Sequence, residues 1–142
     1  MTKNILISCV KSKLLSRAKA QDLYISTLFR LNLEYARCLE PDAIYILSAK
    51  HGLVSLDEEI NPYEMTLNTM GVSQKKAWAQ KVLENLRQKT DLVHDHFVFL
   101  AGMNYRKYLI PSMHSYEVPL EGYSFGEQLR ELKRRINECN LR

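Results

Sequence analysis

The chain has 142 residues, enough to bury about two-thirds of its unfolded surface in one core and too few for two ordinary domains. Hydrophobic residues make up 46% of it and charged residues 25%, which excludes a disordered or fibrous protein. We therefore predict a single domain over residues 1–142.

The net charge and the length of the apolar runs indicate which classes of binding partner are compatible with the chain. Twenty Lys and Arg against sixteen Asp and Glu give a net charge of +4, which suits nucleic acid or phosphate without requiring either. No apolar run approaches the roughly 20 residues of a membrane helix, and the N-terminus leads straight into a strand rather than a signal peptide. We expect a cytoplasmic protein without a membrane partner.

The cysteines are Cys9, Cys38 and Cys139, and they show neither a C-x-x-C motif nor paired spacing. An odd number without such spacing argues against a disulfide framework and against structural zinc. The four histidines also lack the spacing of metal ligands. We expect free thiols and predict no metal or other cofactor.

The first half of the chain alternates between strand and helix patterns. Residues 4–9 form a short apolar run that ends in polar residues, typical of a strand buried in a parallel sheet, and residues 43–47 repeat the pattern. Between them, apolar positions recur every three or four residues, which predicts a helix over about 22–39. Glycine, proline and asparagine then predict an irregular segment over 48–72, and segments of that length are usually functional in a compact domain.

The second half continues the alternation. Ser73 and Ser124 are candidate N-caps of two amphipathic helices, and Phe125 is expected on the inner face of the second. The elements predicted here are a helix over 74–89, a strand over 96–100, a short helix near 105–109, an edge strand over 116–118 and a helix over 124–139.

This alternation predicts an α/β fold, a compact three-layer arrangement in which helices flank a small, mainly parallel sheet of three to four or more strands. Ligands of such open sheets bind outside the carboxyl ends of the strands. The rule selects the loops that follow the three predicted buried strands, namely residues 8–13, 48–52 and 101–105.

The first of these loops carries Ser8, Cys9, Lys11 and Lys13. Two lysines with neighbouring hydroxyl groups suit an anionic group such as phosphate. The sequence has no G-x-x-x-x-G-K-[ST] or G-x-G-x-x-G pattern, which excludes a Walker A loop and a dinucleotide fingerprint. Cys9 is either a nucleophile or, as is more common at a strand end, a small buried apolar residue.

The second loop places Lys50 and His51 side by side between Ser48 and Gly52. An imidazole suits general acid or base catalysis, and an ammonium stabilises developing negative charge. Gly52 permits a sharp turn or the close approach of a ligand. We predict that His51 and Lys50 are catalytic; the alternative is a structural histidine beside an exposed lysine.

Two further segments carry side chains suited to a base or a sugar. Tyr63 and Glu64, if turned inward, would hydrogen-bond a ligand, although a solvated acidic loop is the default interpretation of this segment. Gly102 allows the backbone to approach a ligand closely, and Tyr105 offers a ring that can stack on a base. For Tyr105, simple filling of the core is an equal alternative.

Five short motifs, in the same order, resemble segments of the YaaA-type peroxide-stress proteins. They are ILISCVK (5–11), DLY (22–24), LSAKHGLV (47–54), NPYEM (61–65) and LAG (100–102). A smaller family of uncharacterised phage and bacterial domains is more similar still. That similarity includes PLEG (119–122), Gly126 and the Lys50-His51 pair before Gly52. The resemblance covers nearly the whole chain and adds Asp22, Tyr24 and Glu121 to the candidate ligand-binding residues.

The YaaA resemblance implies an association with peroxide resistance and with limiting free iron, and DNA binding has been proposed for that family. This chain is markedly shorter than those proteins. We expect it to keep their core and to lack the additional segments that would carry DNA contacts.

Our leading hypothesis is a domain that binds or processes a nucleobase, nucleoside or nucleotide, with hydrolysis or transfer at an N-glycosidic bond as the candidate reaction. Lys11 and Lys13 would hold phosphate, and Asp22 with Tyr24 would order the first loop. An alternative is a non-catalytic DNA-binding protein of oxidative-stress protection, in which the basic residues of 3–19 and 133–142 form one face. A third hypothesis is a phage or prophage accessory protein that binds another protein.

Overall fold

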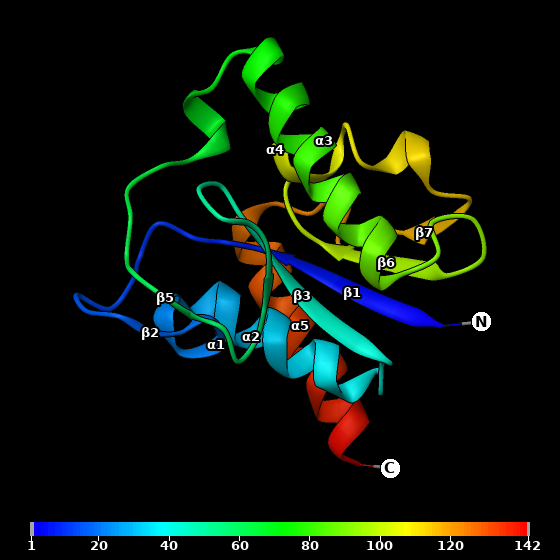
Figure 1. The fold of residues 1–142 in the computed structure, drawn as a ribbon. Coiled ribbons are helices and arrows are strands. Elements are labelled where there is room, and N and C mark those ends of the chain that lie inside the picture. The colour runs from blue at the N-terminus through cyan, green and yellow to red at the C-terminus, as the bar shows by residue number, and fades with distance from the viewer. Residues whose placement is uncertain (1, 142) are drawn as a thin grey trace.

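A five-stranded sheet lies at the centre of the computed structural model, which describes residues 2–141 (Figure 1). The strand order is β4-β3-β1-β6-β7, and every neighbouring pair is parallel except β3 with β4. Ile5, Leu6 and Ile7 of the central strand are fully buried, as expected for a strand covered on both faces. The strands are β1 (Lys3–Ser8), β3 (Ala43–Ser48), β4 (Gly52–Ser55), β6 (His96–Leu100) and β7 (Ser115–Glu117).

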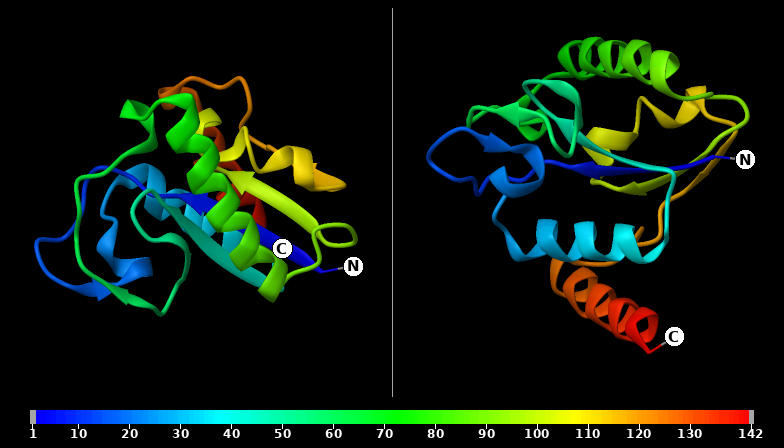
Figure 2. Two further views of the ribbon diagram at one scale, coloured as in Figure 1. Left: turned by 45° about the horizontal axis from the view of Figure 1, so that its top comes forward. Right: turned by 60° about the horizontal axis from the view of Figure 1, so that its bottom comes forward.

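Helices cover both faces of the sheet (Figure 2). On one face lie α3 (Val72–Lys89) and the short α4 (Met103–Arg106); on the other lies α2 (Thr27–Cys38), with α5 (Phe125–Asn140) packed against it. The predicted α/β fold, with a small and mainly parallel sheet between helices, is confirmed. The shorter elements are β2 (Ala18–Lys19), α1 (Ala20–Leu23), β5 (Glu59–Ile60) and two 3₁₀ turns, at Leu67–Thr69 and Ile110–Ser112.

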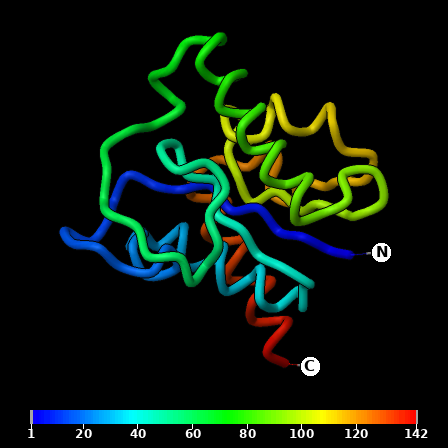
Figure 3. Tube along the Cα trace, viewed as in Figure 1, coloured from blue at the N-terminus to red at the C-terminus, as the bar shows by residue number. Residues whose placement is uncertain are grey.

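The chain leaves β1 and β6 in opposite directions along the sheet. From β1 it passes through α2 to β3 on one side, and from β6 it passes through α4 to β7 on the other. In open α/β sheets such a divergence opens a crevice between the two strand ends, where ligands bind. Residues 61–71, which connect β5 to α3, run along the outside of that edge (Figure 3).

The helix predicted over 22–39 is two helices with a break between them. Tyr24 follows α1 in an extended conformation and forms an isolated antiparallel bridge with Lys13. Ser26 then caps α2, because its Oγ accepts a hydrogen bond from the Phe29 N–H at 3.1 Å. The prediction was wrong here because the apolar spacing continues across the break, whereas the serine cap starts a new helix.

The segment predicted to be irregular, residues 48–72, contains a β-hairpin. β4 pairs antiparallel with β3 through a turn at residues 49–51, and Gly52 begins β4 with a φ of +75°, a conformation that favours glycine. β5 pairs with β2 in a separate two-stranded ribbon. The prediction was wrong because a glycine marks a hairpin and a long loop equally well.

Two helix starts show how the caps differ from the prediction. α3 begins at Val72, so Ser73 lies inside its first turn and Gly71 takes the N-cap position. Ser124 does cap α5, where its Oγ accepts a backbone N–H at 3.3 Å. Phe125, expected on the inner face, is 63% exposed, because the first turn of α5 extends beyond the part of the helix that packs inward.

Candidate functional site

A cavity of about 840 Å³ lies at the carboxyl ends of β1 and β6, where the strand connections diverge. Small-molecule sites have volumes of roughly 300–1,000 Å³. Ser8 and Cys9 enter the wall from the end of β1, and residues 99–102 enter it from the end of β6. Residues 63–66 form its outer side, and Asn32 reaches it from α2.

The predicted site residues fall into two groups, those that line the cavity and those that do not. Those at its wall are Ser8, Cys9, Lys11, Lys13, Tyr63, Glu64, Gly102 and Tyr105. Those away from the wall are Asp22, Tyr24, Ser48, Gly52 and Glu121, together with the predicted catalytic pair Lys50 and His51. The loop 48–52 does not reach the wall because the turn at 49–51 folds back into β4 instead of crossing the crevice.

A buried set of hydroxyl groups lies behind the wall. The hydroxyl oxygens of Tyr63 and Tyr24 are 2.6 Å apart, and the Ser48 hydroxyl donates to the Tyr63 oxygen at 2.8 Å. Burial raises the pKa of both tyrosines, so both stay neutral at physiological pH. These contacts fix the Tyr63 ring at the wall and make Tyr24 and Ser48 positioning residues.

His51 contacts the same ring from outside the cavity. Its imidazole meets the Tyr63 ring edge-on, with 5.4 Å between the centroids, and its backbone N–H donates to the Ser48 hydroxyl at 3.0 Å. Burial, followed by the charge of Lys50, lowers the pKa of His51. Lys50 itself is exposed. Of the predicted catalytic pair, His51 therefore lies behind Tyr63, where a neutral imidazole is favoured.

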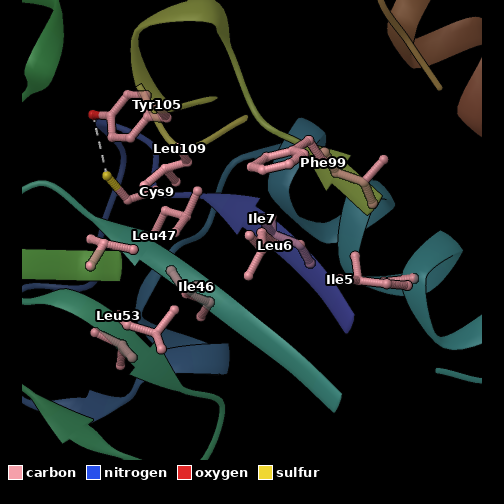
Figure 4. Close-up of a cluster of buried hydrophobic side chains, with 14 of the residues drawn as sticks. Ile5, Leu6, Ile7, Cys9, Ile46, Leu47, Leu53, Phe99, Tyr105 and Leu109 are labelled. Carbon is pink, nitrogen blue, oxygen red and sulfur yellow. Dashed lines mark hydrogen bonds between the residues drawn. The ribbon is translucent and has the colours of Figure 1, made fainter. Parts of the chain in front are cut away.

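Cys9 and Tyr105 meet at the cavity wall (Figure 4). The Cys9 Sγ lies 3.5 Å from the Tyr105 Oη, which also accepts the Leu67 backbone N–H at 3.3 Å. The Tyr105 ring packs edge-on against Trp78, with 5.7 Å between the centroids. Burial, followed by the neighbouring Cys9, raises the pKa of Tyr105 to about 12. Tyr105 is therefore a neutral, fixed hydroxyl group beside the thiol.

Lys13 is a partly buried cation in the wall. Its Nζ lies 4.5 Å from the centroid of the Tyr63 ring, a cation–π arrangement, and donates to the Lys11 carbonyl at 3.1 Å. Burial lowers the pKa of Lys13, while Cys9 and Glu64 act in the opposite direction. Lys11 is exposed and lines the same cavity. The first loop thus supplies one exposed and one partly buried ammonium group.

Sequence reasoning missed several polar residues of the wall, among them Asn32, Arg106 and Gln128. Asn32 is 6% exposed, and within residues 2–141 its Oδ1 has no hydrogen-bond partner. Arg106 is buried and donates to the Ala101 carbonyl at 2.8 Å and to Glu121 at 3.4 Å. An asparagine within the apolar stripe of a helix was the available signal for the first of them.

Metal and membrane sites were also sought in the part of the chain that the structure describes. Within residues 2–141, no group of three or more His, Cys, Asp or Glu side chains is placed to hold a metal ion. Over the same residues, no helix combines the length and the apolar character needed to cross a membrane. Cys9, Cys38 and Cys139 are free thiols.

Neither a curated protein nor a solved structure matches the chain. The resemblance to YaaA-type proteins therefore stays a prediction. A family model does match, and its description is a family of unknown function, DUF6884. The match covers residues 5–134, which include every residue of the cavity wall. The chain therefore belongs to the DUF6884 family of unknown function.

Proposed function

We propose that the cavity binds a nucleobase, nucleoside or nucleotide. The observation that carries this proposal is the Asn32 Oδ1, a buried acceptor in a residue of the wall that has no partner within residues 2–141. An unpaired buried acceptor costs about 1–3 kcal/mol, so a turn of this wall amide toward an N–H or O–H donor of a ligand would be favourable. The edges of bases and the hydroxyl groups of sugars carry such donors.

The rest of the wall suits the same class of ligand. Val10, Leu28 and Leu120 supply apolar surface for a planar ring. Lys11 is exposed and suits a phosphate group as a point charge. Gln128 adds an amide that both donates and accepts. Apolar walls with a few fixed polar groups are the usual composition of small-molecule sites.

For the reaction, hydrolysis or transfer at an N-glycosidic bond is the proposal. Neither Lys50 nor His51 lines the cavity, and His51 would act on the reaction only through the Tyr63 ring that it contacts. His51 is a positioning residue in this scheme, and the groups that would act on the bond come from the first loop and from Tyr105. A cytoplasmic location is part of the same proposal, because free nucleotides are abundant there.

The DNA-binding alternative requires the basic ends of the chain to form one face. Lys3 begins β1, at the opposite edge of the sheet from Lys13, which follows the end of that strand. On α5, Arg134 and Arg135 are paired with Glu131 at 2.7 and 2.9 Å. These positions do not favour the alternative, and it stays a prediction.

A thermal-shift screen against bases, nucleosides and nucleotides tests the proposal, with Asn32→Leu as the test variant. Asn137→Leu is the matched control, because Asn137 is exposed on α5 and the chemical change is the same. A ligand at about 100 times its Kd stabilises the native state by about 2.7 kcal/mol, which gives a shift of several degrees. We expect one ligand class to shift the wild type and the control but not Asn32→Leu. A panel without any shift, or an equal shift in Asn32→Leu, contradicts the proposal.

A further inference from the structure

Cys9 lies where the proposed ligand would meet the end of the central strand. It is the first residue after β1, and its backbone N–H still donates to the Leu47 carbonyl at 3.0 Å, so the sheet fixes its position. Its side chain lines the cavity, and 9% of the residue is exposed. Reacting groups held on rigid elements keep the alignment that a bond-forming step needs.

The titratable groups that face Cys9 come from several segments of the chain. Lys13 lies on the same loop, and Glu64 lies close enough to interact with that lysine. Tyr24 faces the thiol from the position after α1, Tyr63 from residues 61–71 and Tyr105 from α4. Burial raises the pKa of all three tyrosines, so each presents a neutral hydroxyl group. Lys13 is therefore the group of this cluster that can carry positive charge.

Lys13 and Tyr105 suit the activation of a thiol. Lys13 lines the same cavity as Cys9, and burial lowers the pKa of this lysine, so its neutral amine is more available than that of an exposed lysine. The amine can accept the thiol proton, and the ammonium that results stabilises the thiolate. The Tyr105 hydroxyl, 3.5 Å from the sulfur, can donate to that thiolate (Figure 4). A hydrogen bond to the charged form favours that form.

An independent feature points to a ligand at the same place. Asn32 comes from α2, not from the loop of Cys9, and lines the same cavity. The residue is 6% exposed, and its Oδ1 has no partner within residues 2–141. An amide with an unpaired oxygen in the wall gains a hydrogen bond if it turns toward a ligand donor, and an oriented ligand is what a fixed nucleophile requires.

We infer that Cys9 is the nucleophile of this cavity, assisted by Lys13 and Tyr105. The inference rests on the proposed function, because it names the reacting group for the same ligand. In the first step the thiol proton passes to the Lys13 amine, the bond from Sγ to the sugar C1′ forms, and the C1′–N bond breaks. The departing base keeps the electron pair and takes the proton from Lys13. In the second step water or another base attacks C1′, and Cys9 leaves with the proton of the attacking group, so no oxidant or reductant is needed.

Alkylation of the folded, full-length chain with iodoacetamide, followed by peptide mass spectrometry, tests this inference. Iodide leaves as the bond to Sγ forms, so the rate reports the nucleophilicity of each thiol. Cys38 is the internal reference, because burial, followed by the neighbouring Cys139 thiol, raises its pKa to about 11. We expect Cys9 to react faster than Cys38 at neutral pH. Lys13→Met should slow the alkylation of Cys9 by about tenfold, because the cation beside the thiolate is lost. Lys133→Met, an exposed control on α5, should change neither thiol.

The outcomes separate this inference from the proposed function. The inference is overturned, even if a nucleotide binds, when the alkylation rate of Cys9 is no higher than that of Cys38. An alkylation rate of Cys9 that is unchanged in Lys13→Met also overturns it. Base release at an unchanged rate by Cys9→Ala, folded by circular dichroism, also overturns it. Fast, Lys13-dependent alkylation that no base, nucleoside or nucleotide slows leaves Cys9 as the nucleophile and overturns the proposed ligand class.

Discussion

Replacement of Asn32 by Leu should stabilise the protein while it abolishes ligand binding. Asn32 is 6% exposed on α2, and its Oδ1 has no partner within residues 2–141. Removing an unpaired buried acceptor relieves a cost of about 1–3 kcal/mol. Leucine also exceeds asparagine in helix propensity by about 0.5 kcal/mol. The larger side chain can extend into the cavity, although some overpacking offsets the gain, so we expect a net increase of about 1–2 kcal/mol in the free energy of unfolding.

Urea denaturation followed by far-ultraviolet circular dichroism measures this change. For a chain of 142 residues it corresponds to a rise of about 3–6 °C in Tm. The control Asn137→Leu gains helix propensity alone, on the order of 0.5 kcal/mol. A loss of more than about 1 kcal/mol in Asn32→Leu would refute the reasoning, because it would mean that the amide already has a partner, such as an ordered water molecule. Functional sites commonly reduce stability, so a variant that is more stable and no longer binds ligand is the expected result for a binding residue.

Other variants test the elements around the cavity. Tyr63→Phe should lower the free energy of unfolding by about 1–3 kcal/mol, because two buried hydroxyl groups lose the oxygen that they contact. The exposed control Tyr116→Phe should change it by less than about 0.5 kcal/mol, and equal effects would contradict the network. Gly52→Ala should cost about 1–2 kcal/mol in thermal unfolding because its φ is +75°. A Cβ there meets nothing closer than 3.7 Å, so a neutral result would argue against that backbone conformation. Gly126→Ala, inside α5, should instead stabilise by up to about 1 kcal/mol. Because the pKa of His51 is lowered from 6.5 on folding, the unfolded state binds the proton more readily, and stability present above pH 6.5 is lost below it. The Tm of His51→Gln should therefore fall less than that of the wild type on acidification, and parallel Tm profiles would contradict a lowered pKa of His51.

Local sequence patterns locate the sheet edge and much of the cavity. The apolar runs at 4–9 and 96–100 end in polar residues, and the rule for parallel sheets places the loops that follow them, 8–13 and 101–105, side by side. Both loops line the cavity. The same rule fails for 48–52, because it assumes that a helix follows the strand, whereas Gly52 starts an antiparallel partner.

Local sequence patterns do not predict contacts between residues that are far apart in the sequence. Cys9 and Tyr105 are 96 positions apart, so only the assembled sheet shows that their side chains meet. From the sequence, a strand-end cysteine is either a nucleophile or, more commonly, a small buried apolar residue. Asn32 poses the same difficulty, because an asparagine in an apolar stripe finds or lacks a partner only when α2 packs against the sheet. Burial and partner geometry, which decide the chemistry, are properties of the packed core.

Isothermal titration calorimetry of the best ligand of the screen tests the central claim, that this cavity is a nucleotide-class site. We predict saturable binding of one ligand per chain to the wild type and to Asn137→Leu, with no measurable heat in Asn32→Leu. The same titration to Lys11→Met should be weakened only for ligands that carry phosphate, because the exposed ammonium acts on that group alone. Binding to none of the bases, nucleosides or nucleotides, or equal binding to the wild type and Asn32→Leu, would contradict the account.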